Sequence, residues 1–138
     1  MQLFLISIIS GTSLALVLKI VQILFGVQSY LLLFNMDYIP LLHQWNDLAW
    51  TGYVFHYLFC FVSIIGLYYI AKFFQIERNP FVYISVYTIG SGFLYFLTAL
   101  TEEPPSATSL VAWICWIAAH MMFGILVAIL IRKWIKSW

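Results

Sequence analysis

Residues 109–131, SLVAWICWIAAHMMFGILVAILI, contain no Lys, Arg, Asp or Glu, and Arg132 and Lys133 follow them directly. A helix that crosses a lipid bilayer needs roughly 20 consecutive, mostly apolar residues. Basic side chains are enriched in the cytoplasmic segments that border such helices. This stretch therefore predicts a membrane-spanning helix that ends at the two basic residues.

The composition of the whole chain agrees with that prediction. Of the 138 residues, 64% are hydrophobic and 8% are charged, and the mean hydropathy is +1.01. A soluble domain carries about 25% charged residues. Three further apolar stretches are long enough to span a bilayer, at about residues 3–26, 48–71 and 81–101. We expect an all-α integral membrane protein, with residues 1–138 forming a single four-helix transmembrane domain.

The first apolar stretch is interpreted as a retained span rather than a cleaved signal peptide. Signal peptides begin with a basic segment and continue into a short apolar core. Residues 1–10, MQLFLISIIS, have no basic side chain, and Lys19 lies where the apolar core or its cleavage site would be.

The basic residues predict the orientation of the bundle. Cytoplasmic segments of membrane proteins carry an excess of Lys and Arg. Here the segments after the first and third spans have none, and the segments after the second and fourth spans contain Lys72, Arg78, Arg132, Lys133 and Lys136. We therefore expect both chain termini and the middle loop in the cytoplasm.

Three titratable side chains lie inside the predicted spans, namely Lys19, His56 and His120. At about 1.5 Å per helical residue, all three fall in the outer half of the bilayer in this orientation. An ionisable residue inside a membrane often belongs to a path for protons or ions. We therefore expect the three to form a polar intramembrane site. Two alternatives stay open: Lys19 extends to the membrane surface, or each histidine only forms a hydrogen bond between helices.

Carboxylates occur only in the predicted loops. Those on the predicted outer side are Asp37, Asp47, Glu102 and Glu103. They are candidate partners for Lys19 and the two histidines. Glu102 and Glu103 precede two prolines, which end the third span. The pair is either an acidic rim that attracts cations to the outer surface or an ordinary solvated turn.

Small or polar residues recur at helical spacing along each predicted span. Lipid offers no hydrophobic driving force between helices, so small residues mark the faces on which helices approach each other. We expect such packing at Gly11, Ala15, Gly26, Gly52, Ser63, Gly66, Gly92 and Gly124.

Several classes of function find no support in the sequence. A net charge of +1 gives no electrostatic basis for binding nucleic acid. Cys60 and Cys115 lack a CxxC spacing and are expected to be core residues. The chain has no HExxH motif and no Ser/His/Asp order, and an enzyme needs a nucleophile or paired acids near a base. We predict no catalytic activity, cofactor or metal.

The order of several elements resembles the YagU family of small bacterial inner-membrane proteins. The second span has a histidine followed by Phe, Gly, Ala and Phe, the third span ends in ALTEEPP, and the last contains a histidine and ends in IRKW; the residues are His56, Phe59, Gly66, Ala71, Phe74 and His120. Lys19 is similar to a lysine near the end of that family's first span. The resemblance implies a multi-pass protein of the bacterial inner membrane linked to survival in acid.

Two functional hypotheses follow. In the first, the polar site handles ions or protons in a transport, channel or pH-responsive unit, alone or as a homo-oligomer. In the second, the chain is an accessory subunit that docks another membrane protein through its small-residue helix faces. In both hypotheses the protein is embedded in the lipid bilayer.

Overall fold

The computed structural model describes residues 1–39, 41–42 and 50–135, and the described chain is helical without strands. His43 and Asp47 lie outside the described residues. The elements are α1 (Gln2–Phe25), α2 (Ser29–Leu32), α3 (Thr51–Phe73), α4 (Pro80–Leu94), the 3-10 helix η2 (Tyr95–Leu100) and α5 (Leu110–Trp134).

Four segments of the described chain are long and apolar enough to cross a membrane. They are Gln2–Phe25, Thr51–Phe73, Pro80–Leu100 and Leu110–Trp134. The four predicted spans are confirmed, with ends that differ by at most three residues. The third span, Pro80–Leu100, consists of α4 continued by the 3-10 helix η2. Ser91 lies near the end of α4, and Thr98 lies in η2. Their hydroxyls donate to backbone oxygens three residues earlier, a pattern that competes with regular helical bonding.

Local sequence accounts for the helix ends. Asn79 accepts a hydrogen bond from the Phe81 N–H, and Pro80 occupies the first turn of α4, where its missing N–H costs little. Ser109 caps α5 by accepting from the Ala112 N–H. Gly26 ends α1 with a φ of 68°, a left-handed conformation that glycine adopts without steric cost.

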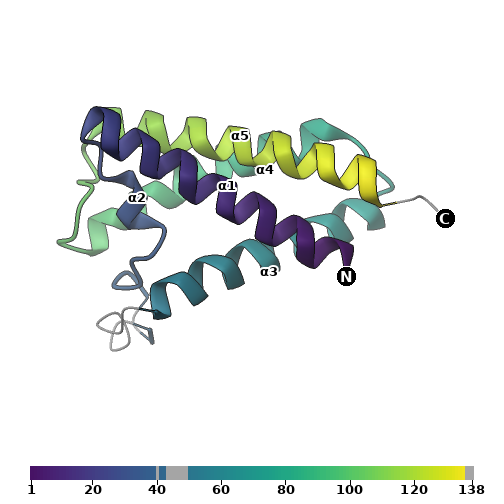
Figure 1. Ribbon diagram of the computed structural model, residues 1–138, viewed down its shortest axis with the longest axis horizontal. Coiled ribbons are helices and arrows are strands. Elements are labelled where there is room, and N and C mark those ends of the chain that lie inside the picture. The colour runs from purple at the N-terminus through teal and green to yellow at the C-terminus, as the bar shows by residue number, and fades with distance from the viewer. Residues whose placement is uncertain (40, 43–49, 136–138) are drawn as a thin grey trace.

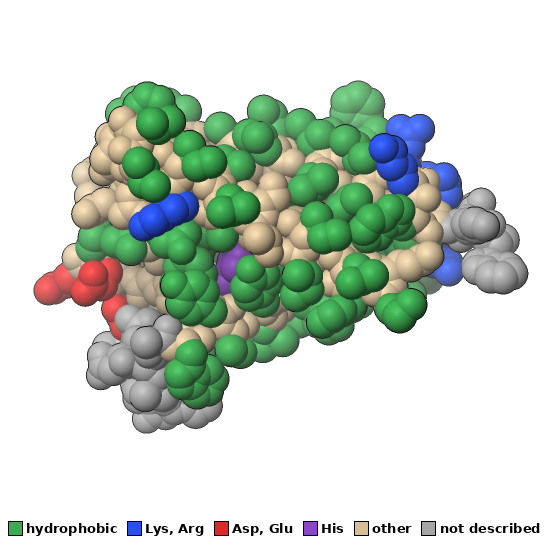
Figure 2. Space-filling view, in the orientation of Figure 1, with side chains coloured by type: hydrophobic (Ala, Val, Ile, Leu, Met, Phe, Trp, Pro, Cys, Tyr) green, Lys and Arg blue, Asp and Glu red, His purple; other side chains and the backbone are tan. Residues whose placement is uncertain are grey.

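The start of α1 and the end of α5 lie at one end of the bundle, together with the connection between α3 and α4, while α2 lies at the opposite end (Figure 1). On the visible face most Lys and Arg side chains gather near the end of α5, and the visible acidic side chains lie at the opposite end (Figure 2). Arg78 donates hydrogen bonds to the backbone oxygens of Arg132 and Ile135, so it joins the α3–α4 connection to the end of α5.

Helix α5 packs closely against α4 and α1, and α3 packs mainly against α1. The α1–α3 contact includes a 2.9 Å hydrogen bond between Thr12 and Tyr57 and an edge-on contact between the rings of Phe4 and Phe61. Among the described residues, α3 has no comparably close backbone contact with α4 or α5. The bundle is therefore tight on the α5 side and looser on the α3 side.

The glycines show where helices approach closely. A Cβ added at Gly124 would lie 2.9 Å from the Tyr83 oxygen, and one at Gly52 would lie 2.5 Å from the Phe34 oxygen. Cβ atoms at Gly11 and Gly92 would lie 3.3 Å from a Cys60 atom and 3.2 Å from an Ile117 atom. Gly11, Gly92 and Gly124 lie at contacts between helices, and Gly52 lies against the segment that follows α2.

Gly26 and Gly66 differ from that prediction, because a Cβ at either would have no neighbour within 4 Å. Gly26 follows the end of α1 and serves as its cap. Gly66 lies on α3 beyond the reach of a neighbouring helix. Ala15 and Ser63 are half-buried, and the Ser63 hydroxyl donates to the backbone oxygen of Cys60 on its own helix.

Candidate intramembrane binding site

A cavity of about 390 Å³ lies inside the bundle, with walls contributed by α1, α2, α3, α4, η2 and α5. Most of its lining is aliphatic or aromatic. The lining residues with polar side-chain atoms are Tyr38, His56, Cys60, Ser63, Tyr87, Ser91, Trp116 and His120. The described part of the lining contains no Lys, Arg, Asp or Glu.

His56 reaches this cavity from α3 and is only 4% exposed. Its Nε2 lies 3.1 Å from the backbone oxygen of Gly11 on α1. A carbonyl oxygen only accepts hydrogen bonds, so Nε2 carries the proton of the neutral ring and Nδ1 is an acceptor. The rings of Phe34 and Tyr57 pack edge-on against the imidazole and fix its orientation.

His120 reaches the same cavity from α5. Its Nδ1 lies 2.8 Å from the backbone oxygen of Trp116, so in the neutral ring Nδ1 donates and Nε2 is left as an acceptor. The Trp116 ring packs against the imidazole with 4.2 Å between centroids. The two histidines thus each use their proton on the backbone and each retain one acceptor nitrogen.

Two indole N–H groups hold α5 against α4 beside the cavity. Trp116 donates to the backbone oxygen of Ser91, and Trp113 donates to that of Gly92, each at 3.0 Å. A buried Trp N–H usually requires a hydrogen-bond partner, and this was the available sequence signal for Trp116. Trp116 shares a helix face with His120 but was not among the predicted site residues.

Tyr87, on α4, was also missed. Its hydroxyl oxygen is enclosed near Ser63, but within the described residues it has no hydrogen-bond partner of good geometry. A buried polar group without such a bond costs about 1–3 kcal/mol. The Tyr87 ring lines the cavity, and its hydroxyl is enclosed beside Ser63.

Tyr38 lines the cavity from the segment that follows α2, outside the spans. Burial raises the pKa of Tyr38 to about 12. Its phenol therefore stays neutral at physiological pH and retains its hydroxyl proton.

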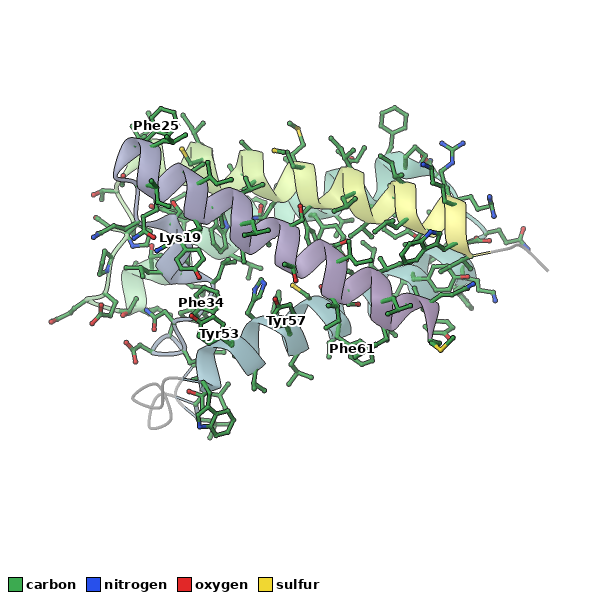
Figure 3. The ribbon with its side chains drawn as sticks, viewed as in Figure 1. Lys19, Phe25, Phe34, Tyr53, Tyr57 and Phe61 are labelled. Carbon is green, nitrogen blue, oxygen red and sulfur yellow. The ribbon has the colours of Figure 1, made fainter. Side chains whose placement is uncertain are left out.

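Lys19 does not join the two histidines, which corrects the predicted three-residue site. Its side chain is exposed, and its Nζ donates to Gln22 Oε1 at 3.2 Å and lies 4.7 Å from the centre of the Tyr30 ring. It lies toward the Phe25 end of α1, far from Phe61 (Figure 3). The small-residue stripe that contains Lys19 is buried at Gly11 and exposed at Lys19, although the adjacent Leu18 is fully buried on another face of α1.

Cys60 does not form a nucleophilic pair with His56. Its sulfur lies 4.0 Å from Nδ1 and 3.9 Å from Nε2, at the outer limit of a hydrogen bond to sulfur and nearly equally far from both nitrogens. A catalytic thiol requires a base within direct hydrogen-bond reach. Across residues 1–39, 41–42 and 50–135, no group of three or more His, Cys, Asp and Glu side chains is arranged to hold a metal.

Glu102 and Glu103 are exposed and lie apart from the central cavity. They line a separate, open depression together with Thr98 and Thr101. The Glu103 N–H donates to the Thr101 hydroxyl, which gives the segment the local bonding of a turn. This arrangement fits the solvated-turn interpretation.

No family model, curated protein or solved structure matches the chain. The functional interpretation therefore depends on the cavity and its two histidines.

Proposed function

We propose that the protein is a multi-pass membrane protein that binds a small, neutral, mostly apolar molecule carrying a hydrogen-bond donor such as a hydroxyl. The observation that carries this proposal is the cavity of about 390 Å³ that His56 and His120 line from different helices. Ligand sites in proteins are typically concave, mostly apolar and about 300–1,000 Å³ in volume, with a few polar groups that orient the ligand.

The charge of the lining supports a neutral ligand. The described lining has no charged side chain of Lys, Arg, Asp or Glu. A buried ion without a partner of opposite charge is strongly destabilised. An apolar molecule loses little by leaving the lipid for these aliphatic and aromatic walls.

The hydrogen-bonding pattern supports a donor on the ligand. In the neutral rings, His56 and His120 have already donated their protons to Gly11 and Trp116 and have acceptor nitrogens left. A ligand hydroxyl can donate to one of these nitrogens. Protonation of either histidine replaces its acceptor with a donor and adds a charge to apolar surroundings, so binding of such a ligand should weaken in acid.

The membrane and orientation are part of the proposal. The basic side chains near the chain ends favour a cytoplasmic location for that end by the positive-inside rule. His56 lies five residues after Thr51, so it is about 8 Å from the start of α3, in the half of the bundle that would face outward. The resemblance to YagU proteins favours a bacterial inner membrane and a role in acid, and the histidines would be the groups that respond to external protons.

Handling of protons or ions is the second candidate. Two imidazoles in one cavity favour it, because histidine exchanges protons near neutral pH. Purified protein in liposomes with an internal pH dye would carry an acid-driven proton flux that His120→Leu removes. Flux equal to that of empty liposomes would eliminate this candidate.

The assembly hypothesis loses part of its basis. Four of the small residues expected to dock a partner, Gly11, Gly52, Gly92 and Gly124, pack against other parts of the same chain. Co-purification of another membrane protein in mild detergent is the measurement that would restore this hypothesis.

Photolabelling of the purified protein in liposomes tests the ligand proposal. The probe is a long-chain fatty alcohol with a diazirine in its chain, and labelled residues are mapped by mass spectrometry. We expect saturable label on cavity residues such as Cys60 and Trp116, competed by the unlabelled alcohol and weaker for the methyl ether of the probe. Label confined to exposed side chains, without saturation, would refute the proposal.

A further inference from the structure

We infer that molecules enter the central cavity sideways from the lipid, through an opening between α3 and α4. The inference deepens the proposed function, because it names the bilayer as the source of the ligand. It depends on the shape of the bundle and on which residues line the cavity.

The cavity extends from buried residues to the outer surface of two helices. His56, Cys60 and Trp116 form its buried part. Phe59 on α3, with 52% exposure, and Val86 and Leu94 on α4, with 47% and 43%, also line it. Because buried and exposed residues line the same cavity, the cavity opens beside the exposed ones. These lie on the side of the bundle between α3 and α4.

The helix packing explains why the opening is there. Helix α3 packs on α1, whereas α4 packs on α5, so α3 and α4 belong to different close contacts. The chain joins α3 to α4 through residues 74–79 at the end of the bundle that holds the start of α1 and the end of α5 (Figure 1). Phe59 and Leu94 lie far along α3 and α4 from that connection, and Val86 lies nearer to it. The two helices are therefore held together at one end and separated along the cavity.

The chemistry of the opening fits lipid and not water. The exposed lining residues Phe59, Val86 and Leu94 are all apolar. Toward the end of the bundle that carries α2, the buried side chains of Leu32 and Leu33 cover the cavity. A molecule dissolved among lipid tails thus meets an apolar opening, whereas one in water meets a covered end.

Gly90 is the position from which this opening can be closed. It lies on α4 and lines the cavity, and a Cβ added there would have no neighbour within 4 Å. A leucine at this position can therefore extend into free space at the opening without displacing the backbone. Gly66, on α3, has the same free space but does not line the cavity, so Gly66→Leu is a matched control.

The test uses a small aryl diazirine dissolved in the liposome bilayer, which labels any side chain it can reach and needs no affinity for the site. The readout is the label on Cys60 and Trp116 divided by that on Met122, an exposed residue of α5. We expect clear cavity labelling in the wild type, a decrease of at least fivefold in Gly90→Leu, and no change in Gly66→Leu. Val86→Trp, a second obstruction of the same opening, should act like Gly90→Leu.

Equal labelling ratios in wild type, Gly90→Leu and Val86→Trp would overturn the inference, as would a wild type labelled on Met122 alone. The result is independent of the ligand proposal. Cavity labelling by the aryl diazirine without saturable labelling by the fatty alcohol would refute the proposed ligand and leave the lateral opening established. Saturable labelling by the alcohol that neither obstruction affects would refute the lateral opening alone.

Discussion

The α4–α5 contact and the α3–α4 side of the same bundle use similar residues with opposite results. At the first, Gly124 lies against the backbone of Tyr83 and Ile84, and indole N–H groups bind the opposite helix. At the second, Gly90 lines the cavity and has free space beside it. A small residue permits close packing of helices, but it produces such packing only where the chain brings a second helix to it.

The largest expected effect is at the tight contact. Gly124→Leu would place side-chain atoms against the Tyr83 oxygen and the Ile84 Cα, which lie 2.9 and 3.0 Å from an added Cβ. Backbone atoms cannot rotate away, so we expect a loss of about 3 kcal/mol or more in the free energy of unfolding. Thermal unfolding in detergent measures it. Gly66→Leu, in free space, should change stability by less than about 1 kcal/mol, and equal losses in both variants would contradict the comparison.

A smaller effect is expected from the hydrogen bonds of this contact. Trp116→Phe keeps an aromatic ring but removes the N–H that binds the Ser91 oxygen. The Ser91 oxygen keeps its hydrogen bond from the Tyr95 backbone N–H, so the variant loses one hydrogen bond and we expect a loss of about 1 kcal/mol. The same unfolding measurement applies. A variant as stable as the wild type would mean that this bond does not hold α4 to α5.

The open side is tested through binding. His120→Leu removes one acceptor nitrogen from the cavity, and a hydrogen bond contributes about 0.5–1.5 kcal/mol. We expect about fivefold weaker competition by the unlabelled fatty alcohol in the photolabelling assay. Met122→Leu, at an exposed site of the same helix, should leave the affinity unchanged. Equal affinity in His120→Leu and wild type would show that this histidine does not contact the hydroxyl.

The smallest effect concerns Tyr38 at the edge of the cavity. Burial raises its pKa from 10.0 to about 12, so the folded state holds this proton more tightly than the unfolded state. Stability should therefore fall as the pH rises from 10 to 12, by about 1 kcal/mol at pH 11 for this group. Tyr38→Phe should lose less stability over this range than the wild type when unfolding is followed at pH 8 and pH 11. Identical losses would show that Tyr38 titrates normally.

The sequence predicts the spans well because the length of an apolar run is a local property. It also places His56 and His120 at similar depth, and both line one cavity. The prediction that Lys19 joins the two histidines is wrong, because helical spacing shows which residues share a face of α1 but not which part of that face contacts other helices. The prediction for Gly66 fails in the same way. The cavity itself results from how α3 diverges from α4, and no single stretch of sequence encodes that angle.

The central claim is that the cavity beside His56 and His120 binds a neutral, mostly apolar molecule from the membrane. Saturation photolabelling with the diazirine fatty alcohol tests it most directly, with label quantified on Cys60 and Trp116. The account predicts saturable label there that the unlabelled alcohol competes away, and that acid weakens. Label only on exposed residues such as Met122, growing in proportion to probe concentration, would contradict it.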